Sequence, residues 1–218
     1  MILIPVGTRP ELMKITPVLR HLRSLSTQTK AFATSQNPQS LLGNISTDLD
    51  FDLYGDFPNR SFPPQLREGI EVVLGEIYQR LSPSVRCLIS IGDTTTAMAT
   101  AICAVRTGIP LAHIEAGMRT PTALYPFPEE LYRRNIDLYA KFLFTHSKID
   151  YKNALDCAAR GSSVFISENP IYDQLYGEVS RNKTTPNLSK TIVMHLHRRE
   201  LTFLEFDKIH DSMNRWAK

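Results

Sequence analysis

The chain has 218 residues, of which 42% are hydrophobic and 22% charged, and these proportions are those of a globular protein rather than of a disordered or collagen-like chain. Its formal net charge of +3 comes from 25 basic and 22 acidic residues that are mixed along the sequence, which favours small anions over nucleic acid as ligands. The three cysteines are far apart and form no CxxC pair, so we expect reduced thiols in a cytoplasmic protein rather than a secreted one.

Short apolar runs alternate along the chain with longer segments whose apolar residues recur every three or four positions, a pattern typical of alternating strands and helices. The first run, residues 2–6, is too short for a signal peptide or a membrane span, so we expect neither a targeting segment nor a membrane partner. The predicted strands are residues 2–6, 30–33, 87–91, 111–114, 141–144, 164–166 and 191–195.

Four helices are predicted between these strands. Apolar stripes cover residues 12–22 and 66–77, a third helix over residues 97–105 begins after Gly92, and a fourth begins near Pro128. Several of the strands are continuous apolar runs, as buried parallel strands are. The sequence therefore predicts an α/β fold with a doubly wound, Rossmann-like parallel sheet, whose ligands bind at the carboxyl ends of the strands.

The chain is long enough for one large domain and the beginning of a second. Residues 1–180 are predicted to form the Rossmann-like domain, and the polar segment 181–190, RNKTTPNLSK, to be a linker. Residues 191–218 hold one strand and one amphipathic helix. Because a single β-α unit cannot bury its apolar face alone, it either docks on the main sheet or needs another chain.

The segment GTRPELMK, residues 7–14, follows the first predicted strand and opens the first predicted helix. The free amides of a helix N-terminus and the charges of Arg9 and Lys14 favour an anion, so a phosphate site is one interpretation. The alternative is that Gly7 and Pro10 only end a strand and begin a helix, with both cations solvated. Neither a dinucleotide-binding GxGxxG pattern nor a P-loop pattern is present.

Three carboxylates follow at predicted carboxyl-end loops. Asp93, after the strand 87–91, is either part of a site or the N-cap of a helix. Glu115 ends the strand 111–114, where packing explains it poorly because glutamate is seldom buried without a partner. Glu129 lies in the first turn of the fourth helix, where it either belongs to the site or complements the helix dipole and pairs with Arg133.

All these carboxylates and cations fall at one edge of the predicted sheet, which favours a shared site. Carboxylates in one cleft push their pKa values apart, so that one can act as an acid while another acts as a base. The cations Arg9, Lys14 and Arg133 can stabilise the charge of a departing phosphate.

The last motif is HLHRRE, residues 195–200, after the last predicted strand. His195 and His197 are two residues apart and point to opposite faces of a regular strand, which disfavours a metal site. We therefore interpret His197, Arg198 and Arg199 as a second anion-binding turn and expect no metal.

The motifs GTRPE with a following lysine, GDTTT, EAGMRT, PFPEE and HRRE occur in this order, and with them the chain resembles the UDP-N-acetylglucosamine 2-epimerase family over residues 1–200. The resemblance covers the N-terminal Rossmann-like domain and the first β-α unit of the C-terminal domain, within a two-domain fold like that of the glycosyltransferase-B group. It implies that C2 of the sugar is inverted by elimination of UDP to a glycal-like intermediate and re-addition of UDP, with no metal, nicotinamide or other cofactor.

Roles follow by position from this resemblance. It implies acid/base roles for Asp93, Glu115 and Glu129. Contacts with the diphosphate or the leaving group are implied for Arg9, Lys14, Arg133 and His197, and substrate binding for Gln36, which also falls on a family position. Arg198, from the anion-binding turn, is a further predicted substrate-binding residue.

The chain also departs from the family pattern. Tyr132 replaces an asparagine before Arg133, Pro121 replaces a glycine, and Asn37-Pro38 replaces a His-Arg pair after Gln36. His195-Leu196 stands where Thr-Gly normally precedes HRRE. The family's Ser-Gly-Gly…Glu-Glu segment, which holds the nucleotide in the C-terminal lobe, is not in this sequence.

Two functional hypotheses follow. The first is an enzyme of polysaccharide biosynthesis that interconverts UDP-GlcNAc and UDP-ManNAc, or a hydrolysing relative, whose ligand is a UDP-sugar or another sugar phosphate. Its cleft would be completed by a partner chain or by a homo-oligomer. The second is a non-catalytic, truncated relative that acts as a regulatory or binding subunit.

Overall fold

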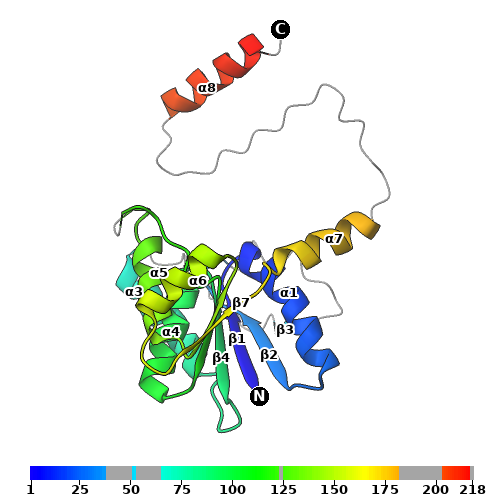
Figure 1. Cartoon of the computed structure of the whole chain (residues 1–218), viewed down its shortest axis with the longest axis vertical. Coiled ribbons are helices and arrows are strands. Elements are labelled where there is room, and N and C mark those ends of the chain that lie inside the picture. Colours follow the sequence, from blue (N-terminus) through cyan, green and yellow to red (C-terminus); the bar gives the residue numbers. More distant parts are fainter. Residues whose placement is uncertain (38–50, 53–64, 123–124, 182–202, 217–218) are drawn as a thin grey trace. The chain divides into compact units, whose positions relative to one another are not determined.

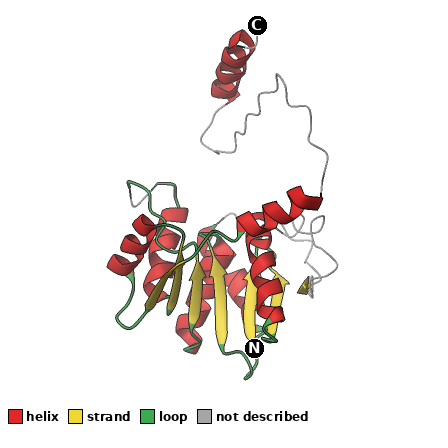
Figure 2. Ribbon diagram, turned by 45° about the vertical axis from the view of Figure 1, so that its right-hand side comes forward, coloured by secondary structure: helices red, strands yellow, loops and turns green. Residues whose placement is uncertain are grey.

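The computed structural model describes residues 1–37, 51–52, 65–122, 125–181 and 203–216. The chain divides into two compact units, Met1–Arg181 and Asn182–Lys218. The first unit is a parallel sheet with helices on both faces (Figures 1 and 2). In the second, the described element is the helix α8, Phe203–Trp216, where an amphipathic helix is predicted. The predicted strand 191–195 and all but the first residue of the predicted linker 181–190 lie outside the described residues.

The sheet has seven strands in the order β3-β2-β1-β4-β5-β6-β7. The strands are β1 Ile2–Val6, β2 Thr29–Ala33, β3 Phe51–Asp52, β4 Cys87–Ile91, β5 Leu111–Ile114, β6 Phe142–Thr145 and β7 Ser163–Ile166. Neighbouring strands pair in parallel throughout. The order reverses between β1 and β4, which is the topological switch point where doubly wound sheets bind ligands. The predicted fold class is confirmed, although β6 begins and ends one residue later than predicted and the two-residue β3 was not predicted.

Six helices of the first unit are described, and all four predicted ones are among them. The helices are α1 Arg9–Ser24, α3 Leu66–Tyr78, α4 Thr95–Thr107, α5 Glu129–Tyr139, α6 Lys148–Cys157 and α7 Ile171–Arg181. The sequence did not predict α6 and α7. In α6 the only buried residue is Ala154, so the helix carries no apolar stripe that its sequence would show. None of the described helices has the length and apolar run that crossing a membrane requires.

The two faces of the sheet are covered by different helices. Leu3 and Leu88 pack with apolar residues of α3, α4 and α5, whereas Ile4 and Ile89 pack against α1. This alternation follows from the two-residue period of a strand. In Figure 1, α3 to α6 lie to the left of the sheet and α1 with α7 to the right, and α1 contacts α7. Because neighbouring strands pair in parallel, their carboxyl-end loops gather at one edge of the sheet.

Candidate active site

The loop between β1 and α1 is held by a glutamate from the first turn of α1. Glu11, in the first turn of α1, is 4% exposed, and its Oε2 accepts hydrogen bonds from the amides of Gly7 and Thr8 at 2.7 and 2.8 Å. The interpretation of this loop as a phosphate site requires free backbone amides. The amides of Gly7 and Thr8 are not free, because they donate to the carboxylate of Glu11, so that interpretation is wrong for these two groups. The second oxygen, Oε1, accepts from the hydroxyl of Thr94 after β4. Glu11 therefore connects the loops on the two sides of the switch point.

Burial raises the pKa of Glu11 to about 7, although four hydrogen bonds, from Thr94, Gly7 and Thr8, oppose this shift. Desolvation penalises the charged form more strongly than these donors stabilise it. The sequence contained a signal for this arrangement, since threonine followed three residues later by glutamate is a capping-box pattern in which the glutamate returns to the N-cap amide. Glu11 was not among the predicted site residues.

Gln36, after β2, helps to hold the start of α4. Its Oε1 accepts from the amide of Thr96 at 2.9 Å and from the Thr96 hydroxyl at 2.8 Å. A Cβ built on Gly7 would lie 2.1 Å from Thr96 Oγ1, so only glycine lets β1 end so close to α4. The carbonyl of the predicted substrate-binding residue Gln36 is thus engaged with the protein itself.

Asp93 is not the N-cap of α4, so that alternative is wrong. The N-cap is Thr94, whose hydroxyl accepts from the amide of Ala97 at 3.1 Å. The carboxylate of Asp93 instead forms an ion pair with Arg133 of α5. Its side chain is 26% exposed and that of Arg133 is 16% exposed, so the pair lies at the surface of the site rather than in the core.

Glu115 follows β5 and is paired with Lys14. The distance from Lys14 Nζ to Glu115 Oε2 is 2.6 Å, and Glu115 is 8% exposed. Lys14 is therefore not simply solvated, and its ammonium group supplies the partner that a mostly buried carboxylate needs. Glu115 has a φ of +72°, which is unusual for a residue with a side chain. A Cβ built on Gly92 would lie 3.1 Å from Glu115 Oε2, so this carboxylate lies against the turn that carries Asp93.

Two residues that the sequence did not predict lie beside Glu115. Asn169 Nδ2 is 3.5 Å from Glu115 Oε1, and His146 Nε2 is 4.0 Å from the same oxygen. They follow β7 and β6, at the same edge of the sheet. No motif signals either residue; the parallel order of the strands brings them here.

The start of α5 carries a second set of charges. Glu130 is fully buried and pairs with Arg133 at 3.4 Å and Arg134 at 2.9 Å. The predicted i,i+4 pair between Glu129 and Arg133 is wrong, because Arg133 turns to Asp93 and Glu130. The Oε2 atom of Glu129 is buried with no hydrogen-bond partner among the described residues.

A group of three charged or titratable side chains, mostly buried, lies behind the two turns that carry Asp93 and Glu115. His113 Nδ1 is 2.6 Å from Asp137 Oδ1, and Arg119 is 2.7 Å from Asp137 Oδ2. Burial opposes ionisation of Asp137, but the hydrogen bond and charge of His113, the charge of Arg119 and the amide of Gly117 outweigh it and lower the pKa of Asp137. The sequence singled out none of these three residues.

The structure thus brings Lys14, Asp93, Glu115 and Arg133 into two ion pairs at one edge of the sheet. Arg9 begins α1 at the same edge, where it is exposed, as the alternative interpretation expected. His197 and Arg198 lie outside the described residues. In the part of the chain that the structure describes, no group of three or more His, Cys, Asp or Glu side chains could hold a metal ion.

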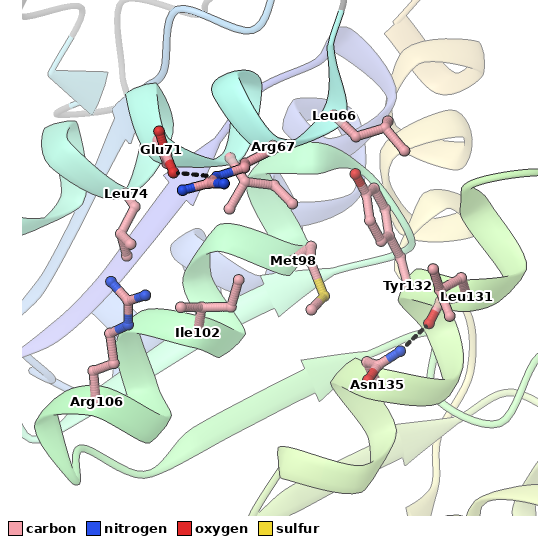
Figure 3. Close-up of a pocket in the computed structure, with 11 residues that line it drawn as sticks. Leu66, Arg67, Glu71, Leu74, Met98, Ile102, Arg106, Leu131, Tyr132 and Asn135 are labelled. Atoms are coloured by element: carbon pink, nitrogen blue, oxygen red, sulfur yellow. Dashed lines mark hydrogen bonds and ion pairs between the residues drawn. The ribbon is translucent and has the colours of Figure 1, made fainter.

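A separate pocket of about 650 Å³ lies between α3, α4 and α5 and contains none of the predicted site residues (Figure 3). Apolar side chains such as Leu74 and Ile102 line it together with Tyr132, whose hydroxyl has its pKa raised by burial. The paired side chains Arg67 and Glu71, 2.9 Å apart, lie at its side. Figure 3 shows Tyr132 lining the pocket from α5. The next residue of this helix, Arg133, forms the ion pair with Asp93.

Lys14 and Glu115 are expected to be energetically coupled. Replacing Lys14 by methionine leaves a mostly buried carboxylate without its cation and is expected to lower the free energy of unfolding by about 2 kcal/mol. The same change in a chain that carries Glu115→Gln should have little effect, giving a coupling energy of about 2 kcal/mol. Urea unfolding of the two single variants, the double variant and the parent measures this energy. Additive effects would show that the pair is only a surface contact.

The family model of UDP-N-acetylglucosamine 2-epimerase matches residues 66–218. Among similar proteins, the UDP-N-acetylglucosamine 2-epimerase of Neisseria meningitidis serogroup A is 30% identical over 211 residues, which cover 89% of this chain and 56% of the relative. The enzyme of the same name from Escherichia coli K12 is 31% identical over 176 residues, with coverages of 78% and 45%. The chain therefore spans about half the length of the curated relatives it matches.

Solved structures agree with this similarity. The crystal structure of UDP-GlcNAc 2-epimerase from Neisseria meningitidis bound to UDP-GlcNAc has a TM-score of 0.71 and 29% identity, and the match covers 84% of this chain and 50% of that one. The structure of Staphylococcus aureus MnaA with UDP has a TM-score of 0.73 and 25% identity, with coverages of 91% and 53%. The motifs in the sequence and the arrangement of the strands thus point to the same relatives.

Proposed function

This chain belongs to the UDP-N-acetylglucosamine 2-epimerase family, and we propose that it supplies the N-terminal half of a site that inverts C2 of UDP-N-acetylglucosamine. In the proposed reaction a carboxylate removes the proton from C2 while the bond from C1 to the diphosphate oxygen breaks. The electron pair forms a double bond between C1 and C2, and UDP leaves. A proton then returns to the opposite face of C2 and UDP adds back to C1, which gives UDP-N-acetylmannosamine.

One observation carries this proposal: two candidate acid/base carboxylates lie at the same sheet edge, and each is paired with a cation. Arg133 pairs with Asp93, and Lys14 pairs with Glu115 at 2.6 Å. Elimination of UDP moves negative charge onto the diphosphate, and a nearby guanidinium or ammonium group stabilises that charge. When the diphosphate draws a cation away, the carboxylate that it leaves becomes a stronger base.

Other residues take supporting roles in the proposal. Glu129 is the third acid/base candidate, and its buried Oε2 lacks a hydrogen-bond partner among the described residues. Exposed Arg9, at the start of α1, would contact the diphosphate, as would His197 and Arg198. Because the carbonyl of Gln36 holds Thr96, Gln36 would act on the substrate only through its amide nitrogen or by fixing α4.

A complete cleft needs more than this half. The relative from Neisseria meningitidis is matched over 56% of its length, and the solved structure with UDP-GlcNAc is matched over 50%. We propose that a second chain, either a separate C-terminal half or another copy of this one, completes the site. Closure of two halves over a substrate excludes water from the elimination.

Proton nuclear magnetic resonance of UDP-GlcNAc in heavy water tests the proposal. The chain is assayed alone and with a separately produced C-terminal half of the Neisseria meningitidis relative. We expect deuterium at C2 and signals of the C2 epimer in the second mixture. Glu115→Gln should lower the exchange rate about 100-fold or more, because a candidate acid/base group is lost. The matched control is Glu71→Gln, an exposed change on α3 that should leave the rate unchanged.

If both mixtures show no deuterium at C2 and no free UDP, the enzymatic proposal is contradicted. Calorimetric titration with UDP then identifies the remaining alternative. Binding of UDP without exchange at C2 would favour a non-catalytic binding subunit. Absence of both would leave the family membership without a nucleotide-sugar function.

A further inference from the structure

His113 lies on β5, two residues before Glu115, and its ring is fully buried. The distance from Nδ1 to Asp137 Oδ1 is 2.6 Å, and that from Nε2 to the carbonyl oxygen of Gly92 is 2.9 Å. Both ring nitrogens therefore face oxygen atoms. Since a backbone carbonyl only accepts hydrogen bonds, Nε2 must carry a proton.

The state of Asp137 decides whether Nδ1 also carries a proton. Its second oxygen, Oδ2, accepts from the amide of Gly117 at 2.9 Å and pairs with Arg119 at 2.7 Å. Burial opposes its ionisation, but the guanidinium of Arg119 and the amide of Gly117 stabilise the charged carboxylate independently of His113. An ionised carboxylate accepts and does not donate, so Nδ1 must donate as well.

We propose that His113 is held as a buried imidazolium and is a positioning residue that fixes the peptide group between Gly92 and Asp93. The amide of Gly92 donates to the carbonyl of Ile114 at 3.0 Å, and its carbonyl accepts from the His113 ring. Residues of β5 thus hold both peptide groups of Gly92, whose φ is +64°. The orientation of the second of these groups sets the direction in which Asp93 leaves the turn toward Arg133.

The same ring links a second turn to this one. Asp137, on α5, holds the amide of Gly117 and the guanidinium of Arg119, both from the loop that begins with Glu115. His113 therefore connects the turn of Asp93, the loop of Glu115 and α5 through two hydrogen bonds made by opposite sides of one ring. A neutral ring can donate only one of them. The proposed function enters this inference at one point, the role of Asp93 in the reaction; the protonation of His113 and its hold on the Gly92 peptide do not depend on it.

The protonation of the ring can be measured without any activity. Long-range proton–nitrogen spectra of the ¹⁵N-labelled full-length chain, recorded between about pH 6 and pH 9, report both ring nitrogens of each histidine. We expect both ring nitrogens of His113 to be protonated near pH 7, because each faces an oxygen acceptor. A neutral tautomer at His113 near pH 7 would overturn the imidazolium assignment.

A reciprocal pair of variants tests the two hydrogen bonds separately. In His113→Asn the amide nitrogen replaces Nδ1 and keeps the bond to Asp137, whereas in His113→Gln it replaces Nε2 and keeps the bond to Gly92. We expect His113→Asn to shift the backbone signals of Asp93 and Thr94 while those of Gly117 and Arg119 stay, and His113→Gln to do the reverse. Equal disturbance of both sets by both variants would contradict the positioning role.

If the parent chain exchanges deuterium at C2, the same variants extend the test to the reaction. His113→Asn should then lower kcat about 100-fold with a small change in KM, because misplacing a reacting group by about 1 Å has an effect of this size. His113→Gln should retain more activity than His113→Asn. If exchange is absent from the parent chain both alone and with the C-terminal half, the proposed function is refuted, whereas the ring spectra still decide the inference about His113.

Discussion

Replacing Glu11 by glutamine is expected to remove about 3 kcal/mol of pH dependence from the stability of this chain. Burial raises the pKa of Glu11 from 4.5 to about 7, so between these values the folded state binds more protons than the unfolded state. The free energy of unfolding therefore falls as the pH rises from about 4.5 to 7, and the full loss is present above 7. Glutamine does not titrate, so this contribution disappears.

Urea unfolding of the parent chain and of Glu11→Gln at about pH 5, 6, 7 and 8 measures the effect, and the difference between the two curves isolates Glu11 from the other titrating groups. Glu11→Ala is the matched control. It removes the acceptor from the amides of Gly7 and Thr8 and should destabilise the chain by about 3 kcal/mol at every pH. Parallel curves for parent and Glu11→Gln would show that Glu11 titrates normally in the folded chain.

Replacing Gly117 by alanine is expected to lower the free energy of unfolding by about 3 kcal/mol. A Cβ at this position would lie 1.9 Å from the carbonyl oxygen of Asp150 at the start of α6, and the φ of Gly117 is +79°. The clash involves backbone and cannot be relieved by a rotamer change. The amide of Gly117 also holds Asp137 at 2.9 Å, so any shift of the loop disturbs the buried pair with His113.

Gly75 provides the control for this prediction. It is exposed within α3, and a Cβ there would meet no atom within 4 Å. Gly75→Ala should therefore stabilise the chain by about 1 kcal/mol, because alanine is the better helix former. Thermal unfolding of both variants compares them directly. A Gly117→Ala chain as stable as the parent would mean that the loop after β5 tolerates displacement.

The sequence predicts most of the sheet because its strands are continuous apolar runs with a two-residue alternation between faces. β4 and β5 have the predicted bounds, Cys87–Ile91 and Leu111–Ile114. The helix α7 carries apolar residues at four-residue spacing, Ile171, Leu175 and Val179, which the sequence prediction did not use, whereas α6 buries only Ala154. Both helices begin with local signals. Ser147 accepts from the amide of Asp150 at the start of α6, and Asn169 accepts from the amide of Ile171 at the start of α7. The cap of α6 therefore marks a helix that the spacing of its apolar residues does not reveal.

Within the site, sequence motifs find residues but not their partners. Lys14 and Glu115 are 101 residues apart, and only the neighbouring positions of β1, β4 and β5 in the sheet bring them to 2.6 Å. The pair of His113 and Asp137 depends on the docking of α5 against β5, which no local pattern encodes. Glu11 is the exception, because its spacing from Thr8 indicates the bond that it forms.

The backbone of Glu115 has a consequence for any attempt to engineer this chain. A left-handed residue with a side chain carries a strain of about 1 kcal/mol or more that glycine would not have, so position 115 is not optimised for thermal resistance. Glycine or asparagine there would relieve this strain but give up the ion pair with Lys14, so the two changes in stability oppose each other. Selection schemes for hardier variants should therefore require that position 115 keeps its carboxylate, which heat tolerance by itself does not reward.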